Sequence, residues 1–261
     1  MFKEAFDKVL SSEAKFAKIH TASSIMQQRL LAWGVSAQRL VRIPLGVDLK
    51  AFIPATEQQK SERRRELGIP EKAFCIGSFH KDGVGMDAGD EPKPIKGPDI
   101  LLKVVEGVSR QHPVFVLLSA PARGYVKAGL ERLGVPYAHV VLDDYLQMPR
   151  LYRAIDLYLL TSREEGGPKG VLESLASGIP IVATRVGLAP DVIRPGENGL
   201  LADSEDVPSL VGHVMDLIES PGLRTRFAVN GLKTITDYDW SSIAARYYAE
   251  IYKPILEQSA K

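Results

Sequence analysis

The sequence has 261 residues, of which 45% are hydrophobic and 25% charged, as in an ordinary globular protein rather than a disordered or fibrous one. Basic and acidic residues nearly balance, 33 against 32, and the net charge of +1 argues against a dedicated nucleic-acid binder. The single cysteine, Cys75, excludes an internal disulfide framework and most thiolate metal sites, and it fits a reducing compartment.

The sequence predicts neither a membrane span nor a secretory leader. No apolar run approaches the ~20 residues that cross a bilayer. The N-terminus carries Lys3 and Glu4 where a signal peptide has its apolar core, so we expect a cytoplasmic protein. Residues 1–72 carry 13 basic and 8 acidic side chains. This excess is either a patch for peripheral contact with an anionic membrane surface or an ordinary solvated face.

The first 70 residues predict a short α/β segment followed by a linker. The expected elements are an amphipathic helix over 2–18, a strand over 16–22, a helix over 24–33 and a strand over 40–43. Three turn signals around a charged stretch then predict a linker and a short helix. We place a domain boundary between residues 50 and 70.

From Phe74 onward, short apolar strands alternate with helical patterns. Strands are predicted over 74–77, 114–119, 139–142, 157–160, 181–184 and 199–201, and helices over 98–111, 124–133, 147–154, 169–177, 189–193 and 207–219. This alternation predicts a doubly wound α/β fold with a parallel sheet covered on both faces. Ligands then bind at the carboxyl ends of the strands, in the loops after Gly77, Ser119, Leu142 and Leu160. A last helix is expected from Trp240 to about Leu256, capped by Asp239.

The densest group of chemically informative residues lies in segment 161–173. A strand ends, a glycine-rich loop follows, and a helix begins near Lys169, which leaves backbone N–H groups and a positive charge for a phosphate or a sugar hydroxyl. Glu165 starts the loop and Glu173 follows eight residues later, so both carboxylates are expected to line one cleft. The alternative is a tight turn with Glu173 as a partner of the helix dipole.

Glu165 and Glu173 match the E-x7-E pattern of retaining GT-B glycosyltransferases of family 4, and the surrounding sequence resembles that family in order. The strand text AIDLYLLTS precedes the pair, and LESLASGIPIVAT and GENGLL follow it. The segment IPLGVD, residues 43–48, resembles the text before the interdomain linker of the family. The resemblance runs from about Ile19 to Tyr252.

This resemblance implies specific roles in binding a nucleotide sugar. Glu173 would accept hydrogen bonds from the ribose hydroxyls, and Glu165 would bind the transferred sugar and act as the catalytic carboxylate. Further contacts to the nucleotide sugar, mostly through the backbone, would come from Ser162, Gly167, Lys169, Gly170, Val171 and Leu172. The family usually has E-G-F-G where this chain has Glu165-Gly166-Gly167-Pro168, so the sugar contacts differ in detail.

The basic pair that the family places after the first strand of this domain is altered. Ser78 stands where the arginine is expected, and Lys96 carries the lysine after a long insertion over 79–95. We expect Lys96 to stabilise the departing diphosphate and Lys81 to replace the missing arginine, the alternative for both being a solvated lysine. Arg123 either reaches the phosphates or begins the helix over 124–133.

The resemblance implies retention of anomeric configuration by front-face attack, without a covalent intermediate, a metal or another cofactor. The sequence Asp237-Tyr238-Asp239 matches the D-x-D motif with which another glycosyltransferase fold binds a metal. Asp239 is better placed as a helix N-cap. The five histidines lack paired ligand spacing. UDP- or GDP-linked sugars are the expected substrates, with a glycan or a lipid-linked molecule as acceptor.

The resemblance also divides the chain. Residues 1–50 correspond to a remnant of the acceptor-side domain, 51–70 to the linker, 71–222 to the Rossmann-like donor-binding domain and 223–261 to C-terminal helices that cross back. Either the chain is a piece of a longer one or a partner supplies the rest. Phe2, Phe6 and Trp33 would then form an exposed apolar face that promotes self-association.

Three functions remain open at this stage. The first is a retaining hexosyltransferase for which this chain supplies the donor-binding half. The second is a non-catalytic module or inactive fragment that binds a nucleotide sugar. The third, another enzyme on the same fold such as an epimerase or a phosphorylase, lacks its expected signature residues.

Overall fold

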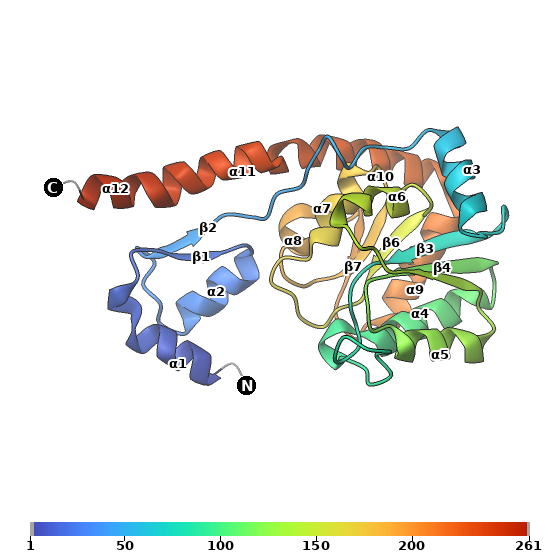
Figure 1. Ribbon diagram of the computed structural model, residues 1–261, viewed down its shortest axis with the longest axis horizontal. Coiled ribbons are helices and arrows are strands. Elements are labelled where there is room, and N and C mark those ends of the chain that lie inside the picture. The colour runs from blue at the N-terminus through green and yellow to red at the C-terminus, as the bar shows by residue number, and fades with distance from the viewer. Residues whose placement is uncertain (1–2, 260–261) are drawn as a thin grey trace.

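A small N-terminal unit and a larger α/β domain make up the computed structural model, which describes residues 3–259 (Figure 1). The N-terminal unit contains α1 (Lys3–Ser11), η1 (Glu13–Lys15), β1 (Ile19–Thr21), α2 (Ser24–Ala32) and β2 (Leu40–Arg42). β1 and β2 pair in parallel, in the predicted strand–helix–strand order. The first helix ends at Ser11 instead of residue 18. The Ser11 hydroxyl donates to the carbonyl of Lys8, a bond that competes with continuation of the helix.

The α/β domain is built on one parallel sheet. Its strands are β3 (Phe74–Ser78), β4 (Val114–Ser119), β5 (Tyr137–Val140), β6 (Leu157–Leu160), β7 (Ile181–Thr184) and β8 (Leu200–Ala202), in the order β5-β4-β3-β6-β7-β8. The doubly wound α/β prediction is confirmed, and β4, β6 and β7 have the predicted bounds. The prediction for β5 was two residues late, because residues 137–140 are the ones that pair with β4.

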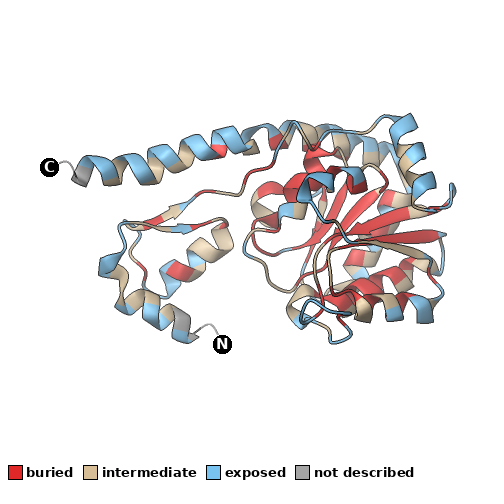
Figure 2. Ribbon diagram, viewed as in Figure 1, coloured by how far each residue is buried: buried red, intermediate tan, exposed pale blue. Residues whose placement is uncertain are grey.

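Helices cover both faces of the sheet. α4 (Pro98–Ser109), α5 (Gly124–Leu133) and α9 (Val207–Glu219) pack on one face, and α6 (Pro149–Tyr152), α7 (Lys169–Ala176) and α8 (Ala189–Val192) pack on the other. β6 shows why both faces are apolar: Leu157 and Leu159 enter one core, whereas Tyr158 and Leu160 enter the opposite one. Buried residues accordingly concentrate in the sheet and the inner sides of its helices (Figure 2).

The linker helix α3 (Glu57–Glu66) lies at the edge of the α/β domain, and the C-terminal helices return toward the N-terminal unit (Figure 1). They are α10 (Pro221–Thr234), η4 (Ile235–Tyr238), α11 (Trp240–Tyr247), the π-helix η5 (Tyr248–Tyr252) and α12 (Lys253–Ser259). Asp239 caps α11 by accepting from the Ser241 N–H at 2.9 Å, as predicted. Arg246 donates to the carbonyl of Arg42, which ties α11 to β2. The domain bounds given above stay predictions.

None of the helices in residues 3–259 is both long enough and apolar enough to cross a membrane.

Candidate functional site

The candidate site lies at the carboxyl ends of β3 and β6. These neighbouring strands connect in opposite directions along the sheet, β3 to β4 and β6 to β7. β3 pairs with β4 on one side and with β6 on the other, so the connections after β3 and β6 diverge at this point of the sheet. Such a switch point at the carboxyl ends of parallel strands is where open α/β sheets bind ligands. The loop over 79–97 and the loop over 161–168 meet here, which brings two separately predicted segments together.

Lys96, Glu165 and Ser162 form the centre of the site. Lys96 Nζ lies 2.6 Å from Glu165 Oε1, and the buried Ser162 hydroxyl donates to the same oxygen at 2.8 Å. The Glu165 side chain is only 12% exposed. A carboxylate and an ammonium group thus lie together at the carboxyl ends of the strands, and each compensates the charge of the other.

Gly97 allows the two loops to approach this closely. Its φ of +62° favours glycine, and an added Cβ would lie 1.9 Å from the carbonyl oxygen of Thr161. The Thr161 hydroxyl donates to the Gly97 carbonyl at 3.0 Å, so the loops are also hydrogen-bonded. The Lys96-Gly97 sequence therefore sets the position of the lysine relative to the second loop.

Glu173 lies in α7 and is 5% exposed. The Tyr152 hydroxyl donates to Glu173 Oε2 at 3.0 Å, and the Tyr145 hydroxyl donates to Oε1. Burial raises the pKa of Glu173, and these two hydrogen bonds oppose the rise because they favour the carboxylate. Lys169 lies 5.0 Å from the centre of the Tyr145 ring. Glu173 is thus a buried hydrogen-bond acceptor, and Tyr145, which donates to it, is about half exposed.

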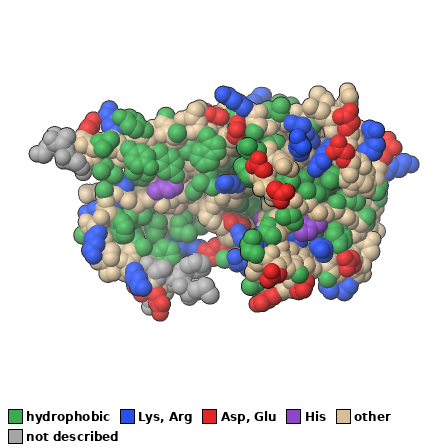
Figure 3. Space-filling model, viewed as in Figure 1, with side chains coloured by type: hydrophobic (Ala, Val, Ile, Leu, Met, Phe, Trp, Pro, Cys, Tyr) green, Lys and Arg blue, Asp and Glu red, His purple; other side chains and the backbone are tan. Residues whose placement is uncertain are grey.

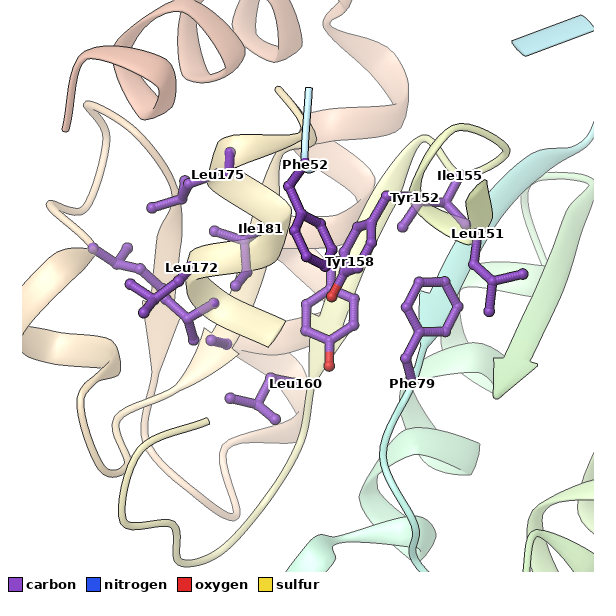
Figure 4. Close-up of a cluster of buried hydrophobic side chains, with 14 of the residues drawn as sticks. Phe52, Phe79, Leu151, Tyr152, Ile155, Tyr158, Leu160, Leu172, Leu175 and Ile181 are labelled. Atoms are coloured by element: carbon purple, nitrogen blue, oxygen red, sulfur yellow. The ribbon is translucent and has the colours of Figure 1, made fainter. Parts of the chain in front are cut away.

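An aromatic cluster packs in the same hydrophobic core as α7. The rings of Phe79, Tyr152 and Tyr158 lie 5.0–5.7 Å apart between centroids, and Phe52 from the linker packs on Tyr152 (Figure 4). Leu172 of α7, also drawn in Figure 4, belongs to the same buried hydrophobic cluster as these rings. Tyr152 belongs to α6, Phe79 to the loop after β3 and Phe52 to the linker. Because Tyr152 donates to Glu173, the position of Glu173 depends on these three segments. Sequence reasoning did not assign Tyr145 or Tyr152; only the loop position of Tyr145, after a strand, was a signal.

The predicted backbone contacts around the start of α7 are partly available. α7 begins at Lys169, so the N–H groups of Lys169 and Gly170 have no partner within the helix. The Val171 N–H already donates to the Pro168 carbonyl at 3.1 Å. The side chains of Val171 and Leu172 are fully buried in the core. The side chains of Val171 and Leu172 thus belong to the core, and the backbone contacts predicted for residues 167–172 stay predictions.

Arg123 does not reach the site, which corrects the phosphate interpretation. Its side chain is fully buried, with Nε 2.9 Å from Asp82 Oδ1, and Nη1 donates to the carbonyls of Ser78, His80 and Ser119. The guanidinium is therefore enclosed by protein and is not accessible to a ligand. The start of α5 is covered as well, because the Gly124 and Tyr125 N–H groups donate to carbonyls of the insertion.

The insertion over 79–95 folds back on itself and is fastened by Arg123. Val84 donates to Glu91 at 2.9 Å and Lys93 donates to Asp82 at 2.7 Å, both between backbone groups. Lys81, the predicted substitute for the missing arginine, has its Nζ 3.3 Å from Met86 Sδ within this insertion. The structure therefore does not bring Lys81 to Lys96 and Glu165, because its side chain is directed along the insertion.

A pocket of about 680 Å³ opens beside Glu165, between the N-terminal unit and the α/β domain. Phe6, Met26 and Arg29 line it from the N-terminal unit, and Ile95 and Glu164 are among the residues on the opposite side. Arg29 forms an ion pair with Glu164 across the boundary. Figure 3 shows the hollow between the two parts of the molecule.

Two residues of the predicted apolar face, Phe6 and Trp33, contact each other in the N-terminal unit. The rings of Phe6 and Trp33 lie 3.9 Å apart between centroids, and Trp33 is 39% exposed. Phe2 lies outside the described residues. Self-association through this face stays a prediction. Within residues 3–259, no group of three or more His, Cys, Asp or Glu side chains has the geometry to hold a metal ion.

Comparison with proteins of known sequence gives partial matches. The chain is 26% identical over 229 residues to the D-inositol 3-phosphate glycosyltransferase of Corynebacterium urealyticum, a match that covers 83% of this chain and 51% of that protein. It is 28% identical over 210 residues to the GDP-mannose-dependent monoacylated alpha-(1-6)-phosphatidylinositol monomannoside mannosyltransferase of Corynebacterium glutamicum, covering 76% and 52%. The chain spans about half the length of these curated relatives.

Solved structures share the fold. Anabaena HepE in complex with UDP and glucose superimposes with a TM-score of 0.75 at 23% identity, over 90% of this chain and 63% of that one. A glycosyltransferase from Rickettsia africae gives a TM-score of 0.80 at 18% identity, over 97% and 67%. The family described as glycosyl transferases group 1 matches residues 92–234, more than half of the chain, so this chain belongs to that family.

Proposed function

We propose that this member of the glycosyl transferases group 1 family supplies the nucleotide-sugar-binding half of a retaining hexosyltransferase of family 4. The observation that carries the proposal is the Lys96–Glu165 ion pair at the switch point of the sheet, with buried Glu173 on α7, the helix that follows the same loop. One cation and two hydrogen-bond acceptors suit the three parts of a nucleoside-diphosphate sugar: diphosphate, transferred sugar and ribose.

Each of these residues takes one part of the nucleotide sugar in this proposal. Glu173 accepts from the ribose hydroxyls, which replace the Tyr145 hydroxyl now bound to it. Glu165 accepts from hydroxyls of the transferred sugar. Lys96 leaves its ion pair with Glu165 and binds the diphosphate. Their ion pair with each other holds both groups at the site without leaving either charge uncompensated.

In the proposed reaction the bond between the anomeric carbon and the diphosphate oxygen breaks, and an acceptor hydroxyl oxygen bonds to that carbon on the same face. The acceptor proton passes to the departing diphosphate, so the configuration is retained without a covalent enzyme intermediate. Negative charge grows on the diphosphate in the transition state. Lys96, Lys169 and the N-terminus of α7 supply fixed positive charge for it, and we propose no metal or other cofactor.

The pocket beside Glu165 is the proposed position of the acceptor, a glycan or a lipid-linked molecule. UDP and GDP are the proposed nucleotides. The names of similar proteins support this choice, since one solved structure contains UDP-glucose and one relative is described as GDP-mannose-dependent. Peripheral contact with an anionic membrane surface through the basic N-terminal residues is part of the same proposal.

Calorimetric titration of the chain with UDP, GDP and ADP tests the proposal. Saturable one-to-one binding of one nucleotide supports it and identifies the base. Product analysis by NMR, with the matching nucleotide sugar, then tests transfer and retention. Binding without turnover of the nucleotide sugar would favour a non-catalytic module.

Three variants test the assigned roles. Glu173→Ala should weaken binding of the nucleoside diphosphate, whereas Glu165→Gln should spare it and remove the additional affinity contributed by the sugar. Glu205→Gln is the matched control, because Glu205 is an exposed glutamate paired with Arg163 outside this cluster. Unchanged binding in both test variants would refute the proposal.

A further inference from the structure

Tyr145 covers the carboxylate of Glu173 in the candidate site. Its hydroxyl donates to Glu173 Oε1, and the Tyr152 hydroxyl donates to Oε2. With both oxygens bound in this way, Glu173 is only 5% exposed. A hydroxyl of a ligand can therefore reach this carboxylate only after one of the two tyrosines has moved.

The two tyrosines differ in how firmly they are held. Tyr152 is fully buried, and its ring centroid lies 5.0 Å from that of Phe79 and 5.7 Å from that of Phe52. Tyr145 is 49% exposed, and its ring lies farther from Phe52, at 6.2 Å between centroids. Tyr145 can thus leave Glu173 without opening the hydrophobic core, whereas Tyr152 cannot.

The segment that carries Tyr145 is a short surface turn, η3 (Tyr145–Gln147), between β5 and α6. Its backbone hydrogen bonds run within the turn. The Leu146 N–H donates to the Asp144 carboxylate at 2.9 Å, and the Gln147 N–H donates to the Asp144 carbonyl at 3.0 Å. The Leu146 side chain is 72% exposed. A turn that is held mainly by its own hydrogen bonds, with exposed side chains, opens at a low cost in free energy.

We propose that Tyr145 is a gate over the ribose site, closed in the free chain and opened when a nucleotide binds. This inference rests on the proposed function and concerns the regulation of the same site. The phenol hydroxyl and the ribose compete for Glu173 Oε1, so only the open form binds the ribose. The affinity for a ligand is then reduced by the fraction of chains that are open. The gate thereby favours release of the nucleoside diphosphate after transfer.

Tyr145→Phe tests the gate, because phenylalanine retains the ring and removes the hydroxyl that competes with the ribose. In calorimetric titration the variant should bind UDP or GDP, whichever the unmodified chain binds, about tenfold more tightly, which corresponds to about 1.4 kcal/mol. The corresponding nucleoside should gain the same factor because it carries the same ribose, whereas binding of inorganic pyrophosphate should not change. A merely structural role of Tyr145 would not increase the affinity for any of these ligands.

Two further variants complete the experiment. Tyr145→Leu also lacks the hydroxyl and should likewise bind the nucleotide more tightly than the unmodified chain. Tyr137→Phe is the matched control, because Tyr137 donates its hydroxyl to another glutamate, Glu131, at 2.7 Å and outside the site. Its nucleotide affinity should equal that of the unmodified chain.

The outcomes separate the gate from the proposed function. Unchanged or weaker nucleotide binding by both Tyr145 variants, with the circular dichroism spectrum of the unmodified chain, would overturn the gate and leave the proposed function intact. An equal gain for pyrophosphate would overturn the gate too, because that ligand has no ribose. Binding of a nucleotide by the Tyr145 variants alone would support both proposals. If neither the unmodified chain nor these variants bind a nucleotide, the proposed function and the gate are refuted together.

Discussion

Replacing Arg123 by methionine should remove the ion pair and the hydrogen bonds that hold the insertion over 79–95 against the sheet. Methionine retains an apolar stem of similar length but supplies neither the charge nor the hydrogen-bond donors. In the structure both Arg123 and Asp82 are fully buried, with Nε and Oδ1 2.9 Å apart. Three backbone carbonyls lose their shared donor in the same substitution.

The expected loss in the free energy of unfolding is about 3–5 kcal/mol at pH 7, the usual effect of leaving one member of a buried ion pair uncompensated. Domains of this kind have a total stability of about 5–15 kcal/mol. The variant should therefore remain folded but be markedly less stable. Arg110→Met, which removes an exposed pair with Glu106, should cost less than about 1 kcal/mol.

The loss should also depend on pH. Burial raises the pKa of Asp82 to about 6, and Arg123 opposes that rise. The folded chain therefore binds more protons than the unfolded chain between about pH 4 and pH 6, and stability falls as pH rises through that window. Without Arg123 the pKa of Asp82 rises further. The difference between variant and unmodified chain should then be larger at pH 7 than at pH 5.

Urea unfolding monitored by circular dichroism at both pH values measures these differences. The double variant Arg123→Met/Asp82→Asn should lose less stability than the sum of the two single variants, because the uncompensated carboxylate is absent. A loss below about 1 kcal/mol for Arg123→Met, within the range of surface pairs, would refute the reasoning. So would a loss that is the same at pH 5 and pH 7.

Three further predictions concern single positions. Lys96→Met should weaken nucleoside-diphosphate binding at least tenfold by the loss of a charged contact, with a smaller loss for the nucleoside; equal losses in calorimetry would indicate misfolding instead. In urea titration, Gly97→Ala should lower the free energy of unfolding by at least ~2 kcal/mol, because the added Cβ would clash with the Thr161 carbonyl. Gly68 also has a positive φ but has open space around it, so Gly68→Ala should lower the free energy of unfolding by only ~1 kcal/mol. Burial raises the pKa of Cys75, so its thiol should react with a thiol reagent only after unfolding, and rapid reaction of the folded chain would contradict its buried position.

The sequence alone was sufficient for the architecture of the α/β domain. Strands such as 157–160 are short and continuously apolar, and helical patterns separate them, so local periodicity determines both the element type and the parallel sheet. The E-x7-E spacing similarly located Glu165 and Glu173 on a loop and the helix after it. These inferences succeed because each depends on residues that are close together in the chain.

Side-chain partnerships required the tertiary structure. The sequence left Arg123 open between a phosphate contact and a helix start, and its burial against Asp82, 41 residues earlier, excluded the contact. The same holds for the hydrogen bonds that Tyr145 and Tyr152 donate to Glu173. Such pairings depend on how loops from different strands pack and on which atoms they bury, and no local pattern of residues encodes that. The sequence by itself thus predicted where the candidate site lies, whereas packing decided which of its charged groups are buried against other residues and which are not.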